Sequence, residues 1–156
     1  MRFVLILIST LILSFVAHAA VIVGKARIVD GDTIDVGGQR IRLFGIDAPE
    51  SKQTCTVDGK AWACGQEATW ALAYELAEHW VTCQQRDVDR YKRIVAVCYV
   101  GTEDVNAAMV RQGWALAYRQ YSKDYVPAET DAERNRVGIW RGVFEKPWEW
   151  RREAKR

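Results

Sequence analysis

The chain has 156 residues and a nearly balanced charge, with 22 Lys and Arg against 20 Asp and Glu and a formal net charge of +2. The length suits a single domain with one hydrophobic core, and no repeat, linker or low-complexity tract divides the sequence. The charge excludes the strongly basic composition that would by itself predict nucleic-acid binding, so any such function must come from particular residues.

The first 19 residues are predicted to be a signal peptide. Arg2 supplies a short positive region, Phe3–Val16 is an apolar run, and Ala17-His18-Ala19 fits a cleavage site. We therefore expect a mature chain that begins at Ala20 and is exported to the periplasm or the medium. The alternative is an uncleaved membrane anchor, because the apolar character continues to Val23 and about 20 such residues span a bilayer.

A hairpin follows a first strand. The β-branched run Val21–Val29 predicts that strand, which the Asp30-Gly31 turn ends. Gly37-Gly38 predicts a two-residue turn that sets the register of the hairpin and leaves its apolar side chains on one face. The expected pairs are Val36 with Gln39, Ile34 with Ile41, and Thr33 with Arg42. Asp32 would fall on the apolar face, so either the strand begins after Asp32 or a bulge redirects this residue.

Two loops at the ends of this hairpin carry a group of acidic residues. Asp30 and Asp32 lie in the first loop, and Asp47 and Glu50 lie in the second. Carboxylates without Cys or His neighbours suit Ca²⁺ or Mg²⁺, which prefer oxygen ligands. Each loop alone is more often only a turn, but the two together predict a metal site that can polarise a phosphoryl oxygen and orient a water molecule.

Two arginines extend this chemistry. Arg42 lies on the strand between the acidic loops, and Arg93 closes the segment Asp89–Arg93. A guanidinium matches phosphate geometry with a rigid fork of donors, so the residues together predict phosphodiester cleavage.

A loop and a helix are expected next. Ser51–Gly65 is interpreted as a loop and Glu67–Trp80 as a helix rich in Ala, Leu and Glu. Three of the helical side chains are expected in the core: Trp70, Tyr74 and Leu76. His79 is the only histidine after residue 19 and is interpreted as structural, which disfavours mechanisms that need a histidine pair.

The four cysteines are expected to form two disulfides. Val81–Cys83 and Arg93–Val100 predict two strands, and a turn centred on Arg90-Tyr91 places Cys83 opposite Cys98. Export favours disulfides, and the lack of a CxxC spacing disfavours structural zinc. The expected pairs are Cys55–Cys64 and Cys83–Cys98.

The remaining chain predicts short elements. Val105–Gln112 predicts a helix stopped by Gly113, Trp114–Tyr118 an extended segment, and Pro127–Val137 a last helix. The tail 141–156 is rich in basic residues, which a solvated helix and a frayed end explain equally well. The tryptophans near the C-terminus are expected to cover an edge of the core. The pattern alone gives only an α+β domain.

Four segments resemble the successive signatures of the staphylococcal (micrococcal) nuclease family, the thermonucleases. They are Ile28–Thr33, Arg42–Glu50, Asp89–Arg93 and Val105–Gly113. They occur in the family's order and cover most of the chain from Val21 to Trp140, so the resemblance is specific. Two departures are Ala48, where the family often has Thr, and Lys92, where it often has Gly.

The resemblance implies a fold and an activity. The expected fold is α+β, with a five-stranded OB-fold barrel and about three α-helices over residues 20–140. The expected activity is that of a calcium-dependent endonuclease that cuts DNA and RNA, prefers single-stranded regions and leaves 3′-phosphate ends. We expect a monomer with no obligate protein partner. The alternative is an OB-fold module of the cell envelope that binds nucleic acid or protein with little or no cleavage.

The resemblance also implies roles for the acidic residues. Asp32 and Asp47 would bind Ca²⁺ together with the backbone carbonyl of Ala48. Asp30 and Thr33 would support the site from behind these ligands.

Five further residues would act on the substrate. Glu50 would orient or deprotonate the attacking water, while Arg42 and Arg93 would stabilise the charge that grows on the phosphate. Tyr91 and Tyr118 would contact a nucleotide, although packing at the rim is an equally good interpretation of Tyr118.

Overall fold

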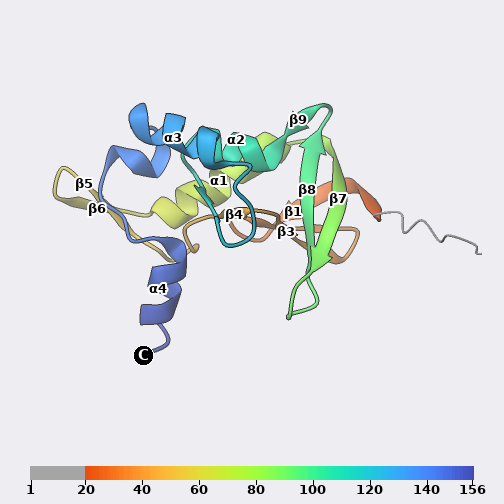
Figure 1. Cartoon of the computed structure of the whole chain (residues 1–156), viewed down its shortest axis with the longest axis horizontal. Coiled ribbons are helices and arrows are strands. Elements are labelled where there is room, and N and C mark those ends of the chain that lie inside the picture. The colour runs from red at the N-terminus through yellow and green to blue at the C-terminus, as the bar shows by residue number, and fades with distance from the viewer. Residues whose placement is uncertain (1–19) are drawn as a thin grey trace, which may run out of the picture.

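Five strands close into a barrel in the computed structural model, which describes residues 20–156 (Figure 1). The hydrogen-bonded order is β3-β2-β1-β7-β8, and parallel pairing of β3 with β8 closes the ring. The strands are β1 (Val21–Ile28), β2 (Thr33–Val36), β3 (Gln39–Leu43), β7 (Trp80–Val88) and β8 (Ile94–Val100). The predicted α+β fold with an OB-like barrel is therefore confirmed. The predicted signal peptide, residues 1–19, lies outside the described residues.

Short strands extend the barrel at its edges. β9 (Glu103–Asp104) pairs with the end of β8, and β4 (Ile46–Asp47) pairs with β10 (Leu116–Ala117). The second pairing is antiparallel, so Tyr118, which follows β10, lies beside Gly45 and donates its backbone N–H to the Gly45 carbonyl.

The β2–β3 hairpin has the predicted register. Thr33 pairs with Arg42, Ile34 with Ile41, and Val36 with Gln39. Gly37 and Gly38 form the turn with φ values of 60° and 82°, in the left-handed region that glycine adopts without strain. β2 begins at Thr33, so the strand begins after Asp32 and no bulge is needed.

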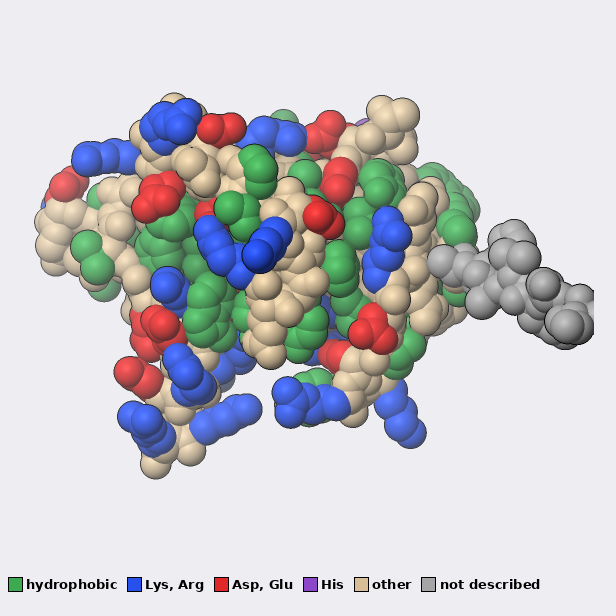
Figure 2. Space-filling model, in the orientation of Figure 1, with side chains coloured by type: hydrophobic (Ala, Val, Ile, Leu, Met, Phe, Trp, Pro, Cys, Tyr) green, Lys and Arg blue, Asp and Glu red, His purple; other side chains and the backbone are tan. Residues whose placement is uncertain are grey.

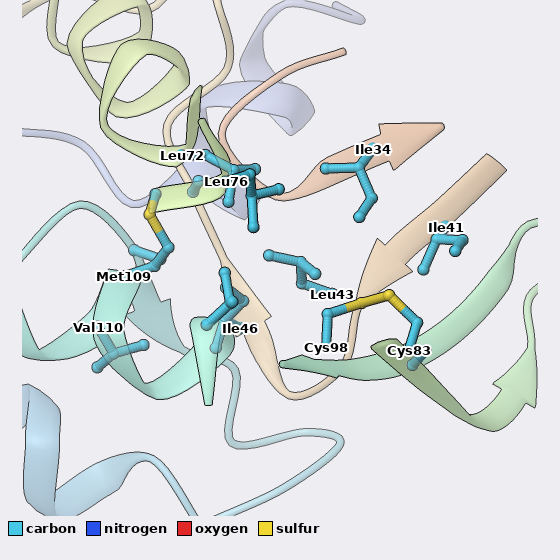
Figure 3. Packing of buried hydrophobic residues seen from close by; sticks show 14 of the residues in the cluster. Ile34, Ile41, Leu43, Ile46, Leu72, Leu76, Cys83, Cys98, Met109 and Val110 are labelled. Carbon is cyan, nitrogen blue, oxygen red and sulfur yellow. A yellow bond between two sulfur atoms is a disulfide. The ribbon is translucent and has the colours of Figure 1, made fainter. Parts of the chain in front are cut away.

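Two helices pack against the barrel and complete the core. Leu72 and Leu76 come from α1 (Cys64–Leu76), and Met109 and Val110 come from α2 (Val105–Arg111). Figure 3 shows these side chains gathered with strand residues around the Cys83–Cys98 disulfide. The described residues 20–156 contain no helix that is both long and apolar enough to cross a bilayer.

The first helix differs from its prediction in position and in orientation. It begins at Cys64 and ends at Leu76, before the predicted end at Trp80. Leu76 is buried as predicted, but Trp70 and Tyr74 are 59% and 82% exposed, so the prediction that they lie in the core is wrong. The buried positions recur every four residues and place both aromatic rings on the outer face.

Both predicted disulfides form. The Cα atoms of Cys55 and Cys64 lie 5.6 Å apart, and those of the directly opposed Cys83 and Cys98 lie 4.0 Å apart. The predicted loop Ser51–Gly65 proves to contain a small hairpin of β5 (Cys55–Val57) and β6 (Lys60–Trp62), which the first disulfide joins to α1.

The C-terminal third carries more helix than predicted. It contains α3 (Val126–Arg134), the 3-10 turn η1 (Gly138–Arg141) and α4 (Pro147–Glu153), so residues 20–156 hold four α-helices rather than about three. The tail is therefore folded and not frayed. Trp140 and Trp148 pack against a second small core around the Cys55–Cys64 disulfide and Leu116, which agrees with the prediction that tail tryptophans cover a core edge.

Candidate active site

Arg42 on β3 connects the two acidic loops. Its Nη2 atom donates to Asp47 Oδ1 at 2.5 Å and lies 3.1 Å from Asp32 Oδ2. The Asp47 side chain is fully buried and that of Asp32 is 6% exposed, whereas the Arg42 side chain is 18% exposed. The structure therefore brings together both predicted calcium ligands, one from the turn before β2 and one from β4.

The Asp32 carboxylate is held by groups on either side of it. Thr33 donates its hydroxyl to Asp32 Oδ1 at 3.0 Å, and the Ala48 backbone N–H donates to Oδ2 at 3.1 Å. Asp30 in turn accepts the Asp32 backbone N–H at 3.0 Å. Asp30, Thr33 and Ala48 thus fix the position of the Asp32 carboxylate. The contact from Asp30 is typical of Asp in a turn, where its side chain accepts a backbone N–H two residues later.

The site carries more negative charge than its arginines neutralise. Burial, together with repulsion from Asp32, raises the pKa of Asp47 to about 6. Burial and the same neighbour raise the pKa of Asp30 to about 6. Burial lowers the pKa of Arg42, but the carboxylates of Asp32 and Asp47 outweigh it, so the net shift is upward. A cation at this position would relieve the remaining repulsion.

The donor set fits a hard divalent cation with water in its coordination sphere. Asp32 and Asp47 offer only oxygen atoms as ligands. The Ala48 carbonyl follows Asp47 directly in the chain. Within residues 20–156, no group of three or more His, Cys, Asp and Glu side chains is arranged to hold a metal ion. Two carboxylates with water and substrate oxygens can suffice for Ca²⁺ or Mg²⁺, whereas zinc would need more nitrogen or sulfur.

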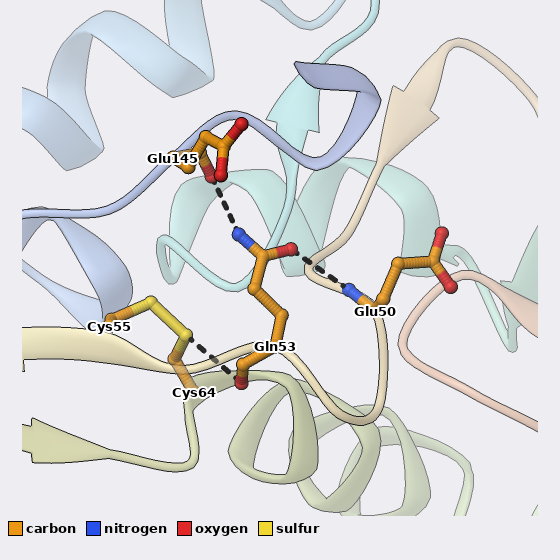
Figure 4. Close-up of a disulfide and its surroundings, with 5 residues drawn as sticks. All are labelled: Glu50, Gln53, Cys55, Cys64 and Glu145. Carbon is orange, nitrogen blue, oxygen red and sulfur yellow. Dashed lines mark hydrogen bonds between the residues drawn. A yellow bond between two sulfur atoms is a disulfide. The ribbon is translucent and has the colours of Figure 1, made fainter. Parts of the chain in front are cut away.

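Glu50 is held at its backbone by a buried glutamine. Gln53 is fully buried; its Oε1 accepts the Glu50 backbone N–H at 3.2 Å, and its Nε2 donates to the Glu145 carbonyl at 2.6 Å (Figure 4). The Gln53 carbonyl accepts the Gly65 N–H at 3.1 Å and lies 3.6 Å from Cys64 Sγ. The first disulfide, α1 and the C-terminal segment therefore all brace the loop that carries Glu50, and sequence reasoning missed Gln53.

Arg93 is placed by the turn between β7 and β8. Asp89 Oδ1 accepts the backbone N–H groups of Tyr91 and Arg93, both at 2.9 Å, and Asp89 Oδ2 accepts Arg93 Nε at 2.7 Å. The Arg93 guanidinium also lies 5.6 Å from the centroid of the exposed Tyr91 ring. Lys92 has φ of 62°, a left-handed conformation that explains why glycine is common at this position in the family that the sequence resembles.

The C-terminal helix α4 brings two residues that the sequence did not identify. Arg151 donates to Asp47 Oδ1 and Oδ2 at 3.0 and 2.7 Å and to Glu50 Oε1 at 2.7 Å. Trp148 stacks on Tyr118, with ring centroids 5.3 Å apart and an interplanar angle of 13°. Only the basic character of the tail hinted at Arg151, and the partners lie about a hundred positions earlier in the chain.

These groups line one open cleft with a volume of about 1460 Å³. The lining includes Arg42, Glu50, Tyr91, Arg93, Tyr118 and Arg151. Figure 2 shows Lys and Arg side chains on α4 and on the tip of the β7–β8 hairpin, at opposite sides of the hollow between these two projections. The cleft can thus offer cations to an extended polyanion. Two of these cations, Arg42 and Arg151, contact the buried carboxylates that lie behind the lining.

Several known proteins are similar in sequence to most of this chain. The sequence model described as staphylococcal nuclease homologue matches residues 40–142. Protein ParB of Escherichia coli is 39% identical over 146 residues, which cover 82% of the chain and 77% of that protein. The succinoglycan biosynthesis protein ExoI of Rhizobium meliloti is 37% identical over 124 residues, covering 77% of the chain and 65% of that protein. The micrococcal nuclease of Shigella flexneri is 37% identical over 147 residues, covering 83% of the chain and 79% of that protein.

Proposed function

The chain belongs to the staphylococcal nuclease family, and we propose that it is a calcium-dependent endonuclease that hydrolyses phosphodiester bonds of DNA and RNA. The observation that carries this proposal is one cleft lined by Arg42, Glu50 and Arg93, in which Arg42 also bridges the buried carboxylates of Asp32 and Asp47. This is the residue inventory that hydrolysis of a phosphodiester requires.

Each side chain has a distinct part in the proposed reaction. Glu50 accepts a proton from the attacking water as its oxygen forms a bond to phosphorus. The bond from phosphorus to the 5′ oxygen then breaks, and the leaving oxygen takes up a proton from solvent. One product carries a 3′-phosphate and the other a 5′-hydroxyl. Arg42 and Arg93 donate to the phosphate oxygens as their charge grows, with Arg93 nearer the leaving oxygen.

Asp32, Asp47 and the Ala48 carbonyl are the residues that would hold the cation. A calcium ion bound there would polarise the phosphoryl oxygen and help to position the water. Burial of both carboxylates and the repulsion between them support this assignment, because a cation bound to both would relieve that repulsion.

The substrate and the setting are part of the same proposal. The exposed Tyr91 and the half-buried Tyr118 line the cleft, where stacking on unpaired bases would favour single-stranded regions. Every group named comes from one chain, which suits a monomer without a protein partner. Two disulfides and the apolar first 19 residues support export to the periplasm or the medium.

Cleavage assays on single-stranded DNA and RNA test this function. Glu50→Gln keeps the shape of the side chain but removes its ability to take a proton, so we expect a rate loss of roughly 10²–10³. Glu78→Gln is the matched control, since Glu78 is highly exposed and pairs only with Lys25. Binding of both nucleic acids without cleavage in any divalent metal would instead identify a binding module.

A further inference from the structure

Arg151 occupies the atoms that the proposed reaction needs. Its guanidinium donates to both oxygens of Asp47 and to one oxygen of Glu50. Asp47 Oδ1 also accepts Arg42, so the charged donors around Asp47 come from two elements, β3 and α4. A charge-assisted contact of this kind is among the stronger hydrogen bonds in proteins.

This arrangement conflicts with the roles of both carboxylates. A divalent cation on Asp47 would lie close to the Arg151 guanidinium and repel it. Glu50 cannot readily take a proton from water while its Oε1 is bound to a permanent cation. The contacts of Arg151 therefore block the site: its guanidinium binds the carboxylate oxygens of Asp47 and Glu50 that a divalent cation and a water molecule would otherwise contact.

The same helix covers the aromatic part of the cleft. Trp148, one turn before Arg151, stacks nearly parallel on Tyr118. The Tyr118 ring face that Trp148 covers is closed to a nucleotide base. One short segment thus engages a metal ligand, the proposed base and a proposed base-stacking tyrosine.

The way α4 is attached to the domain would allow its C-terminal part to move away from the cleft. The start of α4 and the segment before it are anchored, because Pro147 is buried and Gln53 binds the Glu145 carbonyl. The helix itself has seven residues, and beyond Arg151 its last residues are exposed. A helix of this length gains little stability on its own, so it depends on its side-chain contacts with the site.

We propose that α4 is an autoinhibitory plug: Arg151 competes with the divalent cation for Asp47 and Glu50, and Trp148 competes with a base for Tyr118. This inference rests on the proposed function, because it requires a cation site at Asp32 and Asp47. In the open state α4 leaves the cleft and its basic side chains stay near the path of the polyanion.

Calcium binding measured by titration calorimetry tests the competition without using activity. Arg151→Gln removes the competing charge, so we expect Ca²⁺ to bind about tenfold more tightly than to the wild type. Arg152→Gln is the matched control: it makes the same change of charge one residue later, where the side chain is 72% exposed and lies 3.9 Å from Glu149 only. Among residues 20–156 its ion-pair partner is Glu149, which is not a residue of the proposed cation site, so its calcium affinity should stay within about twofold of the wild type.

The outcomes separate the plug from the function that it regulates. Tighter binding in Arg151→Gln alone, or binding seen only in that variant, supports the plug. Equal binding in wild type and Arg151→Gln overturns the plug and leaves the calcium site standing, while weaker binding would make Arg151 part of the site. No binding in any variant removes both proposals.

Hydrogen exchange on the wild type gives an independent test. The Trp150 N–H donates to the carbonyl of Lys146, which caps α4, and the Ala154 N–H donates to the Trp150 carbonyl, so their protection reports whether this helix is formed. Saturating Ca²⁺ should accelerate their exchange at least about fivefold while the barrel amides slow down. Calcium binding with unchanged α4 exchange would overturn the plug.

Discussion

Gln53→Ala should destabilise the fold and impair catalysis together. The side chain is fully buried and makes two hydrogen bonds, one to the Glu50 N–H and one to the Glu145 carbonyl. Each bond contributes about 1 kcal/mol, and loss of the buried packing adds a similar amount, so we expect a loss of roughly 2–4 kcal/mol in the free energy of unfolding. Because the backbone of Glu50 is also released, the cleavage rate should fall about tenfold.

Urea unfolding at equilibrium and cleavage kinetics measure these two effects. Gln53→Glu is a sharper variant, because it replaces the donor with a carboxylate oxygen that would face the Glu145 carbonyl at 2.6 Å. We expect it to lose more stability than Gln53→Ala. Gln39→Ala, at an exposed position that does not line the cleft, is the control. A Gln53→Ala protein within about 0.5 kcal/mol of the wild type would refute the idea that this side chain braces the loop.

Three further predictions concern the arginines, pH and the β7–β8 turn. Arg42→Ala and Arg93→Ala should fold but cleave roughly 10²–10³ more slowly, and near wild-type turnover in either would remove that arginine from the mechanism. The pKa of Asp47 is raised from 3.8 to about 6, so its contribution to stability is present below about pH 4 and lost as pH rises through about 6. Without metal, the melting temperature of the wild type should therefore fall relative to Asp47→Asn between about pH 4 and 7, and a constant difference would contradict the burial argument. Lys92→Gly should raise the free energy of unfolding by up to about 1 kcal/mol because φ is 62°, whereas Arg90→Gly should lower it; equal effects in chemical unfolding would exclude strain at Lys92.

The sequence predicted correctly those contacts that a nearby turn determines. The Gly37-Gly38 turn fixed the pairing of Thr33 with Arg42, because a two-residue loop leaves only one register that keeps the apolar side chains together. The same reasoning about opposed strand positions placed Cys83 against Cys98. Alternation of side chains was sufficient in these cases, since each partner lies a few residues from a turn.

The errors arose where the decisive contact is distant or the face was misjudged. The large rings of Trp70 and Tyr74 suggested that they face the core. The buried residues Ala68 and Leu72 instead define another face of α1. Their four-residue spacing is visible in the sequence and could have identified the buried face. No such signal exists for Arg151, whose partner Asp47 lies 104 positions earlier in the sequence. The fourth helix is short, and its link to the site could only be seen in three dimensions.

The central claim is that a cation held by Asp32 and Asp47 supports phosphodiester hydrolysis in this cleft. The most direct measurement is cleavage of an end-labelled single-stranded DNA by the purified, oxidised protein in a calcium titration, with a chelator as reference. The account predicts no cleavage with chelator, a rise that saturates with Ca²⁺, and products that carry 3′-phosphate. Cleavage that persists in chelator, or its absence at every calcium concentration, would contradict it.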